Sequence, residues 1–149
     1  MKNPKTPCIG ICSTTSLGDS ICRGCKRYSF EVINWNSYDV NGKKAVLKRI
    51  EKLICQIIED KLIIISVPTL KLGLEQANIP FDSQLSPYCW LHNLLKKRHN
   101  QISNLKDYGV DMLPGIAESS LTELSQKIEE ELLVLCRAHF DRYYKTAEI

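Results

Sequence analysis

Several signatures of common protein classes are missing from this sequence of 149 residues. No run of about 18 apolar residues is present, and a membrane-spanning helix needs roughly that length, so we expect no membrane span. No apolar signal region follows residues 1–5, so we expect the protein to stay in the cytoplasm. A glycine-rich phosphate loop, a G-x-S-x-G elbow and an H-E-x-x-H motif are also missing. An enzyme is therefore the least supported class, and the sequence predicts no catalytic residue.

What the chain does contain indicates a globular protein rich in cysteine. Apolar residues make up 44% and charged residues 25%, a balance typical of folded rather than disordered chains. The length suits one ordinary domain, or a small metal module attached to a helical one. Seven cysteines are present, and cysteines of a protein that is not secreted stay reduced. This favours metal binding over disulfides for those that lie close together.

Four cysteines are clustered in the first 25 residues with the spacing C-x3-C-x9-C-x2-C: Cys8, Cys12, Cys22 and Cys25. Thiolates are soft, strong ligands, and four of them can close a tetrahedral shell around Zn²⁺ or anchor an iron–sulfur cluster. Gly10 and Gly24 lie between the paired cysteines, where a chain that wraps an ion needs backbone freedom. We predict that these four cysteines hold one metal centre. Disulfides or unrelated thiols are the alternative.

Positive charge collects around these cysteines. Residues 1–28 contain one acidic residue, Asp19, and five basic ones: Lys2, Lys5, Arg23, Lys26 and Arg27. One interpretation is local, because cations lower the pKa of thiols and offset the negative charge of a metal–thiolate site. The other is an anionic partner such as nucleic acid. Few aromatic residues are interleaved with these cations, which weakens the second interpretation.

We predict a mostly α-helical protein with two parts. Residues 1–35 read as a loop-built, Cys-rich metal-binding module, because they contain prolines, glycines and no regular apolar period. Residues 36–149 read as a helical domain, a bundle of four or five helices. The expected helices begin with a short one after Ser29 and continue at about residues 37–60, 68–77, 87–98, 102–108 and 120–144.

Two details of this assignment depend on weak signals. Residues 62–67 could form a buried strand or the end of a helix, and because no partner strand is evident we favour helix. Residues 110–118, with Pro114 and Gly115, are expected to be a loop. The last helix has the clearest start, since Ser120 and Glu123 form a capping-box pattern.

The remaining cysteines, Cys55, Cys89 and Cys136, lie in predicted helices, where core packing is the usual role of a free cysteine. Two of them have a histidine three residues on: His92 after Cys89, and His139 after Cys136. This spacing places both side chains of a pair on one helical face. If the two helices pack together, a second, Cys2His2 metal site would form between them. We favour core packing.

The N-terminal part resembles a known family. The residues that carry the resemblance are Pro7-Cys8-Ile9-Gly10-Ile11-Cys12, Cys22-Arg23-Gly24-Cys25-Lys26-Arg27, Glu31-Val32, Trp35 and the helix around 43–49. Over about residues 4–51 the chain is similar to the YdhL-like family, small bacterial proteins of unknown function that are predicted to bind an iron–sulfur cluster. The resemblance implies that the four clustered cysteines are the cluster ligands. The chain departs from the pattern at Lys26, where a small residue, often glycine, is expected, and at Gly42, where an acidic helix former is expected.

The spacing of the ligands does not decide between zinc and iron–sulfur, and the resemblance favours iron–sulfur. We therefore expect a centre for electron transfer, redox sensing or structure, with the helical domain as a docking body for a protein partner. The alternative is a zinc-stabilised binding module. It would contact nucleic acid or an acidic protein through Arg23, Lys26 and Arg27.

Overall fold

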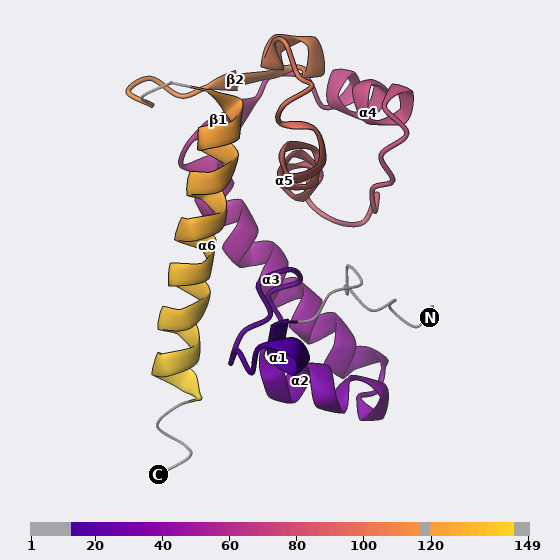
Figure 1. The fold of residues 1–149 in the computed structure, drawn as a ribbon. Helices are drawn as coiled ribbons and strands as arrows, with labels where there is room; N and C mark the ends of the chain where they lie inside the picture. The colour runs from indigo at the N-terminus through magenta and orange to yellow at the C-terminus, as the bar shows by residue number, and fades with distance from the viewer. Residues whose placement is uncertain (1–12, 117–119, 145–149) are drawn as a thin grey trace. The chain divides into compact units, whose positions relative to one another are not determined.

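The structure, a computed structural model, describes residues 13–116 and 120–144 and is mostly α-helical, as predicted. Its longer helices are α2 (Ser29–Asn34), α3 (Val40–Glu59), α4 (Val67–Gln76), α5 (Pro87–Arg98) and α6 (Leu121–Tyr143) (Figure 1). A short helix, α1 (Ser13–Ser16), and two 3-10 turns, η1 (Trp35–Ser37) and η2 (Leu105–Tyr108), lie between them in sequence. Two short strands, β1 (Leu62–Ile64) and β2 (Val110–Met112), complete the fold.

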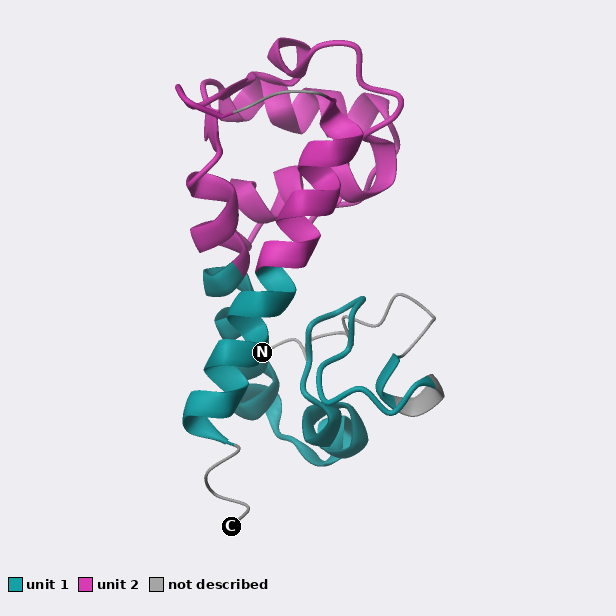
Figure 2. Cartoon of the chain, turned by 60° about the vertical axis from the view of Figure 1, so that its left-hand side comes forward, with its two compact units in different colours: residues 1–53, 132–149 teal, residues 54–131 magenta. Residues whose placement is uncertain are grey.

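The chain divides into two compact units (Figure 2). Unit 1 contains residues 1–53 and 132–149, and unit 2 contains residues 54–131. Both long helices contribute to both units, since α3 and α6 each cross a boundary. The sequence-based division into a module at 1–35 and a helical domain at 36–149 stays a prediction, because Cys8 and Cys12 lie outside the described residues.

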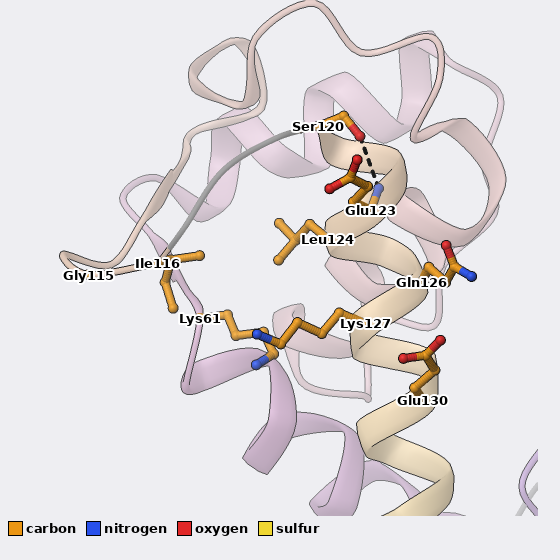
Figure 3. Close-up of a pocket in the computed structure, with 9 residues that line it drawn as sticks. All are labelled: Lys61, Gly115, Ile116, Ser120, Glu123, Leu124, Gln126, Lys127 and Glu130. Atoms are coloured by element: carbon orange, nitrogen blue, oxygen red, sulfur yellow. Dashed lines mark hydrogen bonds between the residues drawn. The ribbon is translucent and has the colours of Figure 1, made fainter.

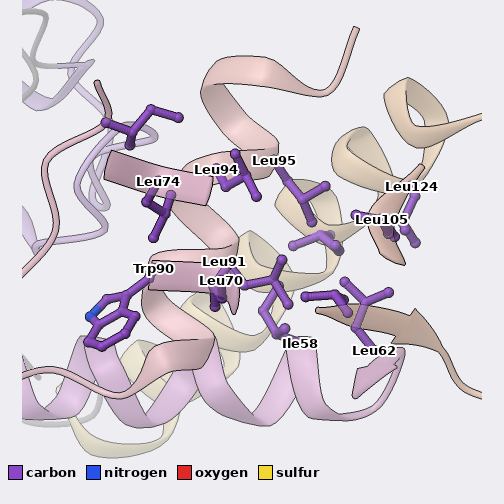
Figure 4. Close-up of a cluster of buried hydrophobic side chains, with 13 residues drawn as sticks. Ile58, Leu62, Leu70, Leu74, Trp90, Leu91, Leu94, Leu95, Leu105 and Leu124 are labelled. Carbon is purple, nitrogen blue, oxygen red and sulfur yellow. The ribbon is translucent and has the colours of Figure 1, made fainter. Parts of the chain in front are cut away.

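The main apolar core lies in unit 2 (Figure 4). It is built by residues that recur every three or four positions on α4 and α5, the period that lines up one helical face. Leu70 and Leu74 of α4 and Leu91 and Leu94 of α5 are fully buried. Burial of each such side chain contributes about 1.5–3 kcal/mol. The hydrophobic effect therefore accounts for the packing of these helices.

Residues 62–64, which we expected to be helical, form a strand, and so do residues 110–112, which we expected to lie in a loop. Strand β1 pairs antiparallel with β2, with Leu62 opposite Met112 and Ile64 opposite Val110. The chain enters β2 through Gly109, whose φ of 68° is a left-handed conformation that glycine adopts without strain. The Gly109 carbonyl accepts hydrogen bonds from Ile65 N at 2.7 Å and Ser66 N at 3.1 Å. A pairing between such short, distant strands leaves no periodic signal in the sequence.

Several helix starts agree with the sequence and others shift slightly. Helix α5 begins at Pro87, directly after the cap Ser86. Ser120 directly precedes α6, and its Oγ accepts a hydrogen bond from Glu123 N in the first turn at 3.1 Å. Helix α4 begins at Val67, one residue before the expected Pro68. Helix α3 begins at Val40, later than the expected start at about residue 37, and Gly42 N in its first turn donates to Asp39 Oδ1 at 2.7 Å. A Cβ at position 42 would lie 3.2 Å from that carboxylate oxygen, which accounts for the glycine there.

An aromatic cluster organises unit 1. Tyr28 has no exposed surface, and its ring lies 5.7 Å from the ring of Phe30 and 5.1 Å from those of Phe140 and Tyr144. These distances suit tilted and edge-to-face aromatic packing. Tyr28 therefore joins the N-terminal segment to the last turns of α6.

Candidate metal centre

The second cysteine pair lies in a tight, buried loop. A bridge between Ile21 and Tyr28 closes the loop, and inside it Cys22 N donates to Arg27 O and Lys26 N to Cys22 O, both at 2.8 Å. Cys22 is 1% exposed and Cys25 is 7% exposed, and both are free thiols. The loop therefore presents two sulfurs to the protein interior rather than to water.

Backbone amides surround the sulfur of Cys22. Burial alone raises the pKa of this thiol, but hydrogen bonds from the backbone of Cys25, Ser13 and Gly24 lower it to about 6. Donors to a sulfur stabilise its thiolate form. The lowered pKa of Cys22 favours its thiolate, the form that binds metals.

Cys25 has a different environment. Burial raises the pKa of its thiol, and Arg27 opposes this effect with its charge, its backbone amide and its side chain. Arg27 Nε lies 3.3 Å from Cys25 Sγ. The guanidinium also lies over the ring of Trp35, with Cζ 5.0 Å from the ring centroid. A cation is thus held directly against the second sulfur.

Lys26 has a left-handed backbone, with φ at 67°. This conformation costs a residue with a side chain about 1–2 kcal/mol and costs glycine little. The expectation of a small residue at this position therefore has a physical reason. The lysine side chain is 1% exposed, and its Nζ donates to the carbonyls of Arg23 and Gly24. These bonds tie the side chain back onto the cysteine loop.

The first cysteine pair, Cys8 and Cys12, lies outside the described residues. The residue that follows Cys12 in the chain, Ser13, does contact the second pair. Its backbone amide hydrogen-bonds the sulfur of Cys22, and its Oγ accepts from Arg23 N at 2.8 Å.

The basic residues of the loop divide into two kinds. The Arg23 side chain is 67% exposed and forms an ion pair with Asp19, with Nε 3.3 Å from Oδ2. Lys26 and Arg27 are buried, and their cationic groups contact the loop itself. Of the three cations that we assigned to a nucleic-acid or acidic partner, Arg23 is therefore the exposed one.

The two predicted Cys–His pairs belong to different units and have other partners. His92 Nε2 lies 2.5 Å from Glu129 Oε1 in unit 2. His139 Nδ1 lies 2.8 Å from the Tyr28 hydroxyl in unit 1. Within residues 13–116 and 120–144 there is no group of three or more His, Cys, Asp or Glu side chains that could hold a metal ion. The alternative of a Cys2His2 site is therefore not formed among the described residues, and both Cys89 and Cys136 are buried, as the favoured core packing predicts.

A buried ion pair next to the cysteine loop was not predicted from the sequence. Glu31 in α2 accepts a hydrogen bond from Tyr28 N at 2.8 Å and pairs with Arg49 of α3. The Arg49 guanidinium lies 4.0 Å from the centroid of the Tyr28 ring, and its Nη2 is 3.5 Å from Lys26 O. Burial raises the pKa of Tyr28, which keeps its hydroxyl protonated. The signal that could have found the pair is Glu31 in the first turn of a short helix, a usual position for a carboxylate that caps.

A pocket of about 570 Å³ lies in unit 2, between the segment of Gly115 and Ile116 and helix α6 (Figure 3). Charged side chains of both signs line it, among them Lys61, Lys127 and Glu130. Lys61 forms an ion pair with Glu131, with Nζ 2.5 Å from Oε2. The lining contains neither cysteine nor histidine, so it adds no thiolate or imidazole to the centre discussed here.

None of the described helices is long and apolar enough to span a membrane. Comparison with known proteins places the cysteine loop within a recognised sequence pattern. Residues 6–53, about a third of the chain, match the family model "Protein of unknown function (DUF1289)". No curated protein and no solved structure matches the chain. The matched segment contains all four clustered cysteines, Glu31 and Arg49, so the chain carries a segment similar to a small, Cys-rich domain of uncharacterised function.

Proposed function

We propose that the N-terminal part of the protein is a metal-binding module in which Cys8, Cys12, Cys22 and Cys25 hold one centre, an iron–sulfur cluster. The observation that carries the proposal is the environment of Cys22. Its sulfur is buried, accepts several backbone N–H groups and has a pKa of about 6. A buried thiolate stabilised in this way is a preformed metal ligand.

The donor set fits such a group. Four cysteine thiolates bind either an iron–sulfur cluster or Zn²⁺, and N–H donors to the sulfurs are a recognised feature of both kinds of site. Arg27 supplies positive charge beside Cys25, as an anionic metal–thiolate centre requires. Burial of both sulfurs argues against a thiol-exchange role, because attack on a disulfide needs an accessible thiolate.

An iron–sulfur cluster would supply one-electron redox chemistry or a structural cross-link. The residues of this chain would bind it, exclude water and offset its charge. The helical remainder then serves as a docking body for a protein partner in the cytoplasm.

The test is metal analysis of the full chain purified without oxygen, with iron, zinc and acid-labile sulfide measured together. We expect iron and sulfide in equal amounts and a visible absorption that dithionite bleaches. Cys22→Ser should lose most of the metal. Cys89→Ser, which changes a buried cysteine of α5 in unit 2, should keep it. A wild-type protein without bound metal, or one with a Cys22–Cys25 disulfide, contradicts the proposal.

Zinc is the second candidate, since the same four thiolates suit it. Colourless protein with zinc and no sulfide would select it. The partner would then be nucleic acid or an acidic protein. Because Lys26 and Arg27 contact the loop, such a partner would meet Arg23 and the basic residues before Cys8. Retention on nucleic acid that falls steeply with salt would support this function.

A further inference from the structure

Arg27 contacts both described cysteines of the loop. Its carbonyl accepts from Cys22 N at 2.8 Å, its backbone amide donates to the Cys25 sulfur, and its Nε lies 3.3 Å from that sulfur. The residue is 3% exposed. Arginine keeps its charge at any physiological pH, so a permanent cation is buried at the sulfur of Cys25.

Trp35 determines where this cation lies. The ring is 6% exposed, and the Arg27 guanidinium carbon is 5.0 Å from its centroid. Stacking on an aromatic face fixes the plane of a guanidinium, which the compact ammonium of lysine does not reproduce. The guanidinium therefore has an aromatic ring at its face and the sulfur of Cys25 at its Nε edge.

A buried cation is stabilised by a compensating negative charge, because burial removes the water that would otherwise solvate it. A Cys25 sulfur bound to a metal centre would supply such a charge, and Arg27 Nε lies 3.3 Å from this sulfur. Conversely, thiolates around Zn²⁺ or an iron–sulfur core carry excess negative charge that a neighbouring cation offsets. The buried guanidinium and the metal–thiolate centre would therefore each offset the charge of the other.

We propose that Arg27, held by Trp35, is a positioning residue that keeps Cys25 bound to the metal centre and controls how fast this ligand is released. The inference rests on the proposed function, since it concerns the same centre. It assigns to Arg27 and Trp35 a role distinct from that of the four ligands. Arg23, two residues before Cys25 and exposed, has no such role.

The experiment compares Arg27→Gln, Arg27→Lys and Trp35→Phe with the matched control Arg23→Gln, each purified with its metal. Metal loss to excess EDTA is followed over time. We expect Arg27→Gln to lose metal about 10–100 times faster than the wild type, the usual effect of removing a group that orients a metal ligand. Arg27→Lys and Trp35→Phe should lose metal at rates between those of the wild type and Arg27→Gln. Arg23→Gln should lose metal at the same rate as the wild type.

A second readout separates ligand release from general loosening of the fold. The metal-loaded proteins are treated briefly with iodoacetamide, and each cysteine is quantified by peptide mass analysis. In Arg27→Gln we expect modification at Cys25 before Cys22. Simultaneous modification of Cys22, Cys25 and the core cysteine Cys136 would indicate unfolding and would overturn the assignment of a local role.

The two proposals fail in different ways. Wild-type protein that binds no metal overturns the proposed function and this inference with it. Wild-type protein that binds metal, together with Arg27→Gln that retains it equally long, overturns the inference alone. If Arg27→Gln does not fold, Trp35→Phe decides, because it keeps the cation and removes only the indole that orients it.

Discussion

The guanidinium of Arg49 is paired through two nitrogens with the carboxylate of Glu31: Nη1 lies 2.5 Å from Oε2 and Nη2 lies 2.8 Å from Oε1. Their side chains are 14% and 5% exposed. The pair joins α2 to α3 directly beside the cysteine loop. Burial disfavours the charged form of Arg49, but the hydrogen bonds and charge of Glu31 outweigh it and raise its pKa.

Breaking this pair should strongly destabilise unit 1. Arg49→Met leaves the Glu31 carboxylate buried without its partner, which costs about 3–5 kcal/mol. Urea unfolding, followed by the fluorescence of the two tryptophans, Trp35 and Trp90, measures the loss. The double variant Glu31→Gln with Arg49→Met should be more stable than Arg49→Met alone, because no charge is left unpaired. Arg142→Met, an exposed change in the same unit, should cost less than about 0.5 kcal/mol.

The left-handed backbone at Lys26 predicts an unusual order of stability. Both Lys26→Gly and Lys26→Ala remove the Nζ hydrogen bonds, but only glycine relieves the strain of a φ of 67°. We expect the glycine variant to be more stable than the alanine variant by about 1 kcal/mol. At Lys48, an exposed position inside α3, the order should reverse by a similar amount. If the alanine variant were more stable than the glycine variant at both positions, the backbone at Lys26 would not be strained.

Two glycines with positive φ should differ sharply in their tolerance of alanine. At Gly109, with φ at 68°, an added Cβ would lie 2.6 Å from the Ser66 carbonyl oxygen, which is backbone and cannot move aside. At Gly115, with φ at 87°, no heavy atom of the described residues other than its chain neighbours lies within 4 Å of the added Cβ. Gly115→Ala should cost about 1 kcal/mol of strain, and Gly109→Ala should cost about 1–3 kcal/mol more from overpacking. Thermal unfolding of the two variants checks the difference.

The environment of His139 predicts a pH dependence of stability. Burial and the nearby charges of Arg49 and Lys52 lower its pKa from 6.5, and Glu31 opposes them. The unfolded chain therefore binds more protons than the folded protein between the lowered value and 6.5. In that window stability falls as the pH falls, and above it this contribution is constant.

His139→Gln should make stability less sensitive to pH in that window, because glutamine does not titrate and can still bond the Tyr28 hydroxyl. The measurement is the free energy of unfolding of both proteins at several pH values below neutrality. A variant with the same pH slope as the wild type would show that other groups produce it.

Local patterns predicted most of the helices and some of their ends. Helices were expected at about residues 68–77 and 87–98, where α4 and α5 lie, and Ser86-Pro87 and Ser120 identified two starts. The two strands escaped prediction, because β1 gains its hydrogen bonds from β2, far along the chain. A short apolar run reads equally as helix or strand until its partner is known.

The candidate site, too, was predicted from the sequence only in part. Cys22 and Cys25 were identified from spacing alone, and their burial in a closed loop suits ligands. Lys26 and Arg27 were read as possible surface cations, since a basic residue in a polar loop is usually solvated. Tertiary contacts with the loop carbonyls, with Cys25 and with Trp35 buried them instead.

The sequence by itself determined the helical class, several helix ends and the presence of a thiol-rich loop, because these depend on residues within a few positions of one another. Only the tertiary structure decided the pairing of β1 with β2, the pairing of Glu31 with Arg49, and which cations face the cysteine sulfurs. Each of these depends on the desolvation and contact of residues that the chain brings together from separate segments. Their energies arise in the folded state and leave no periodic trace in the order of the residues.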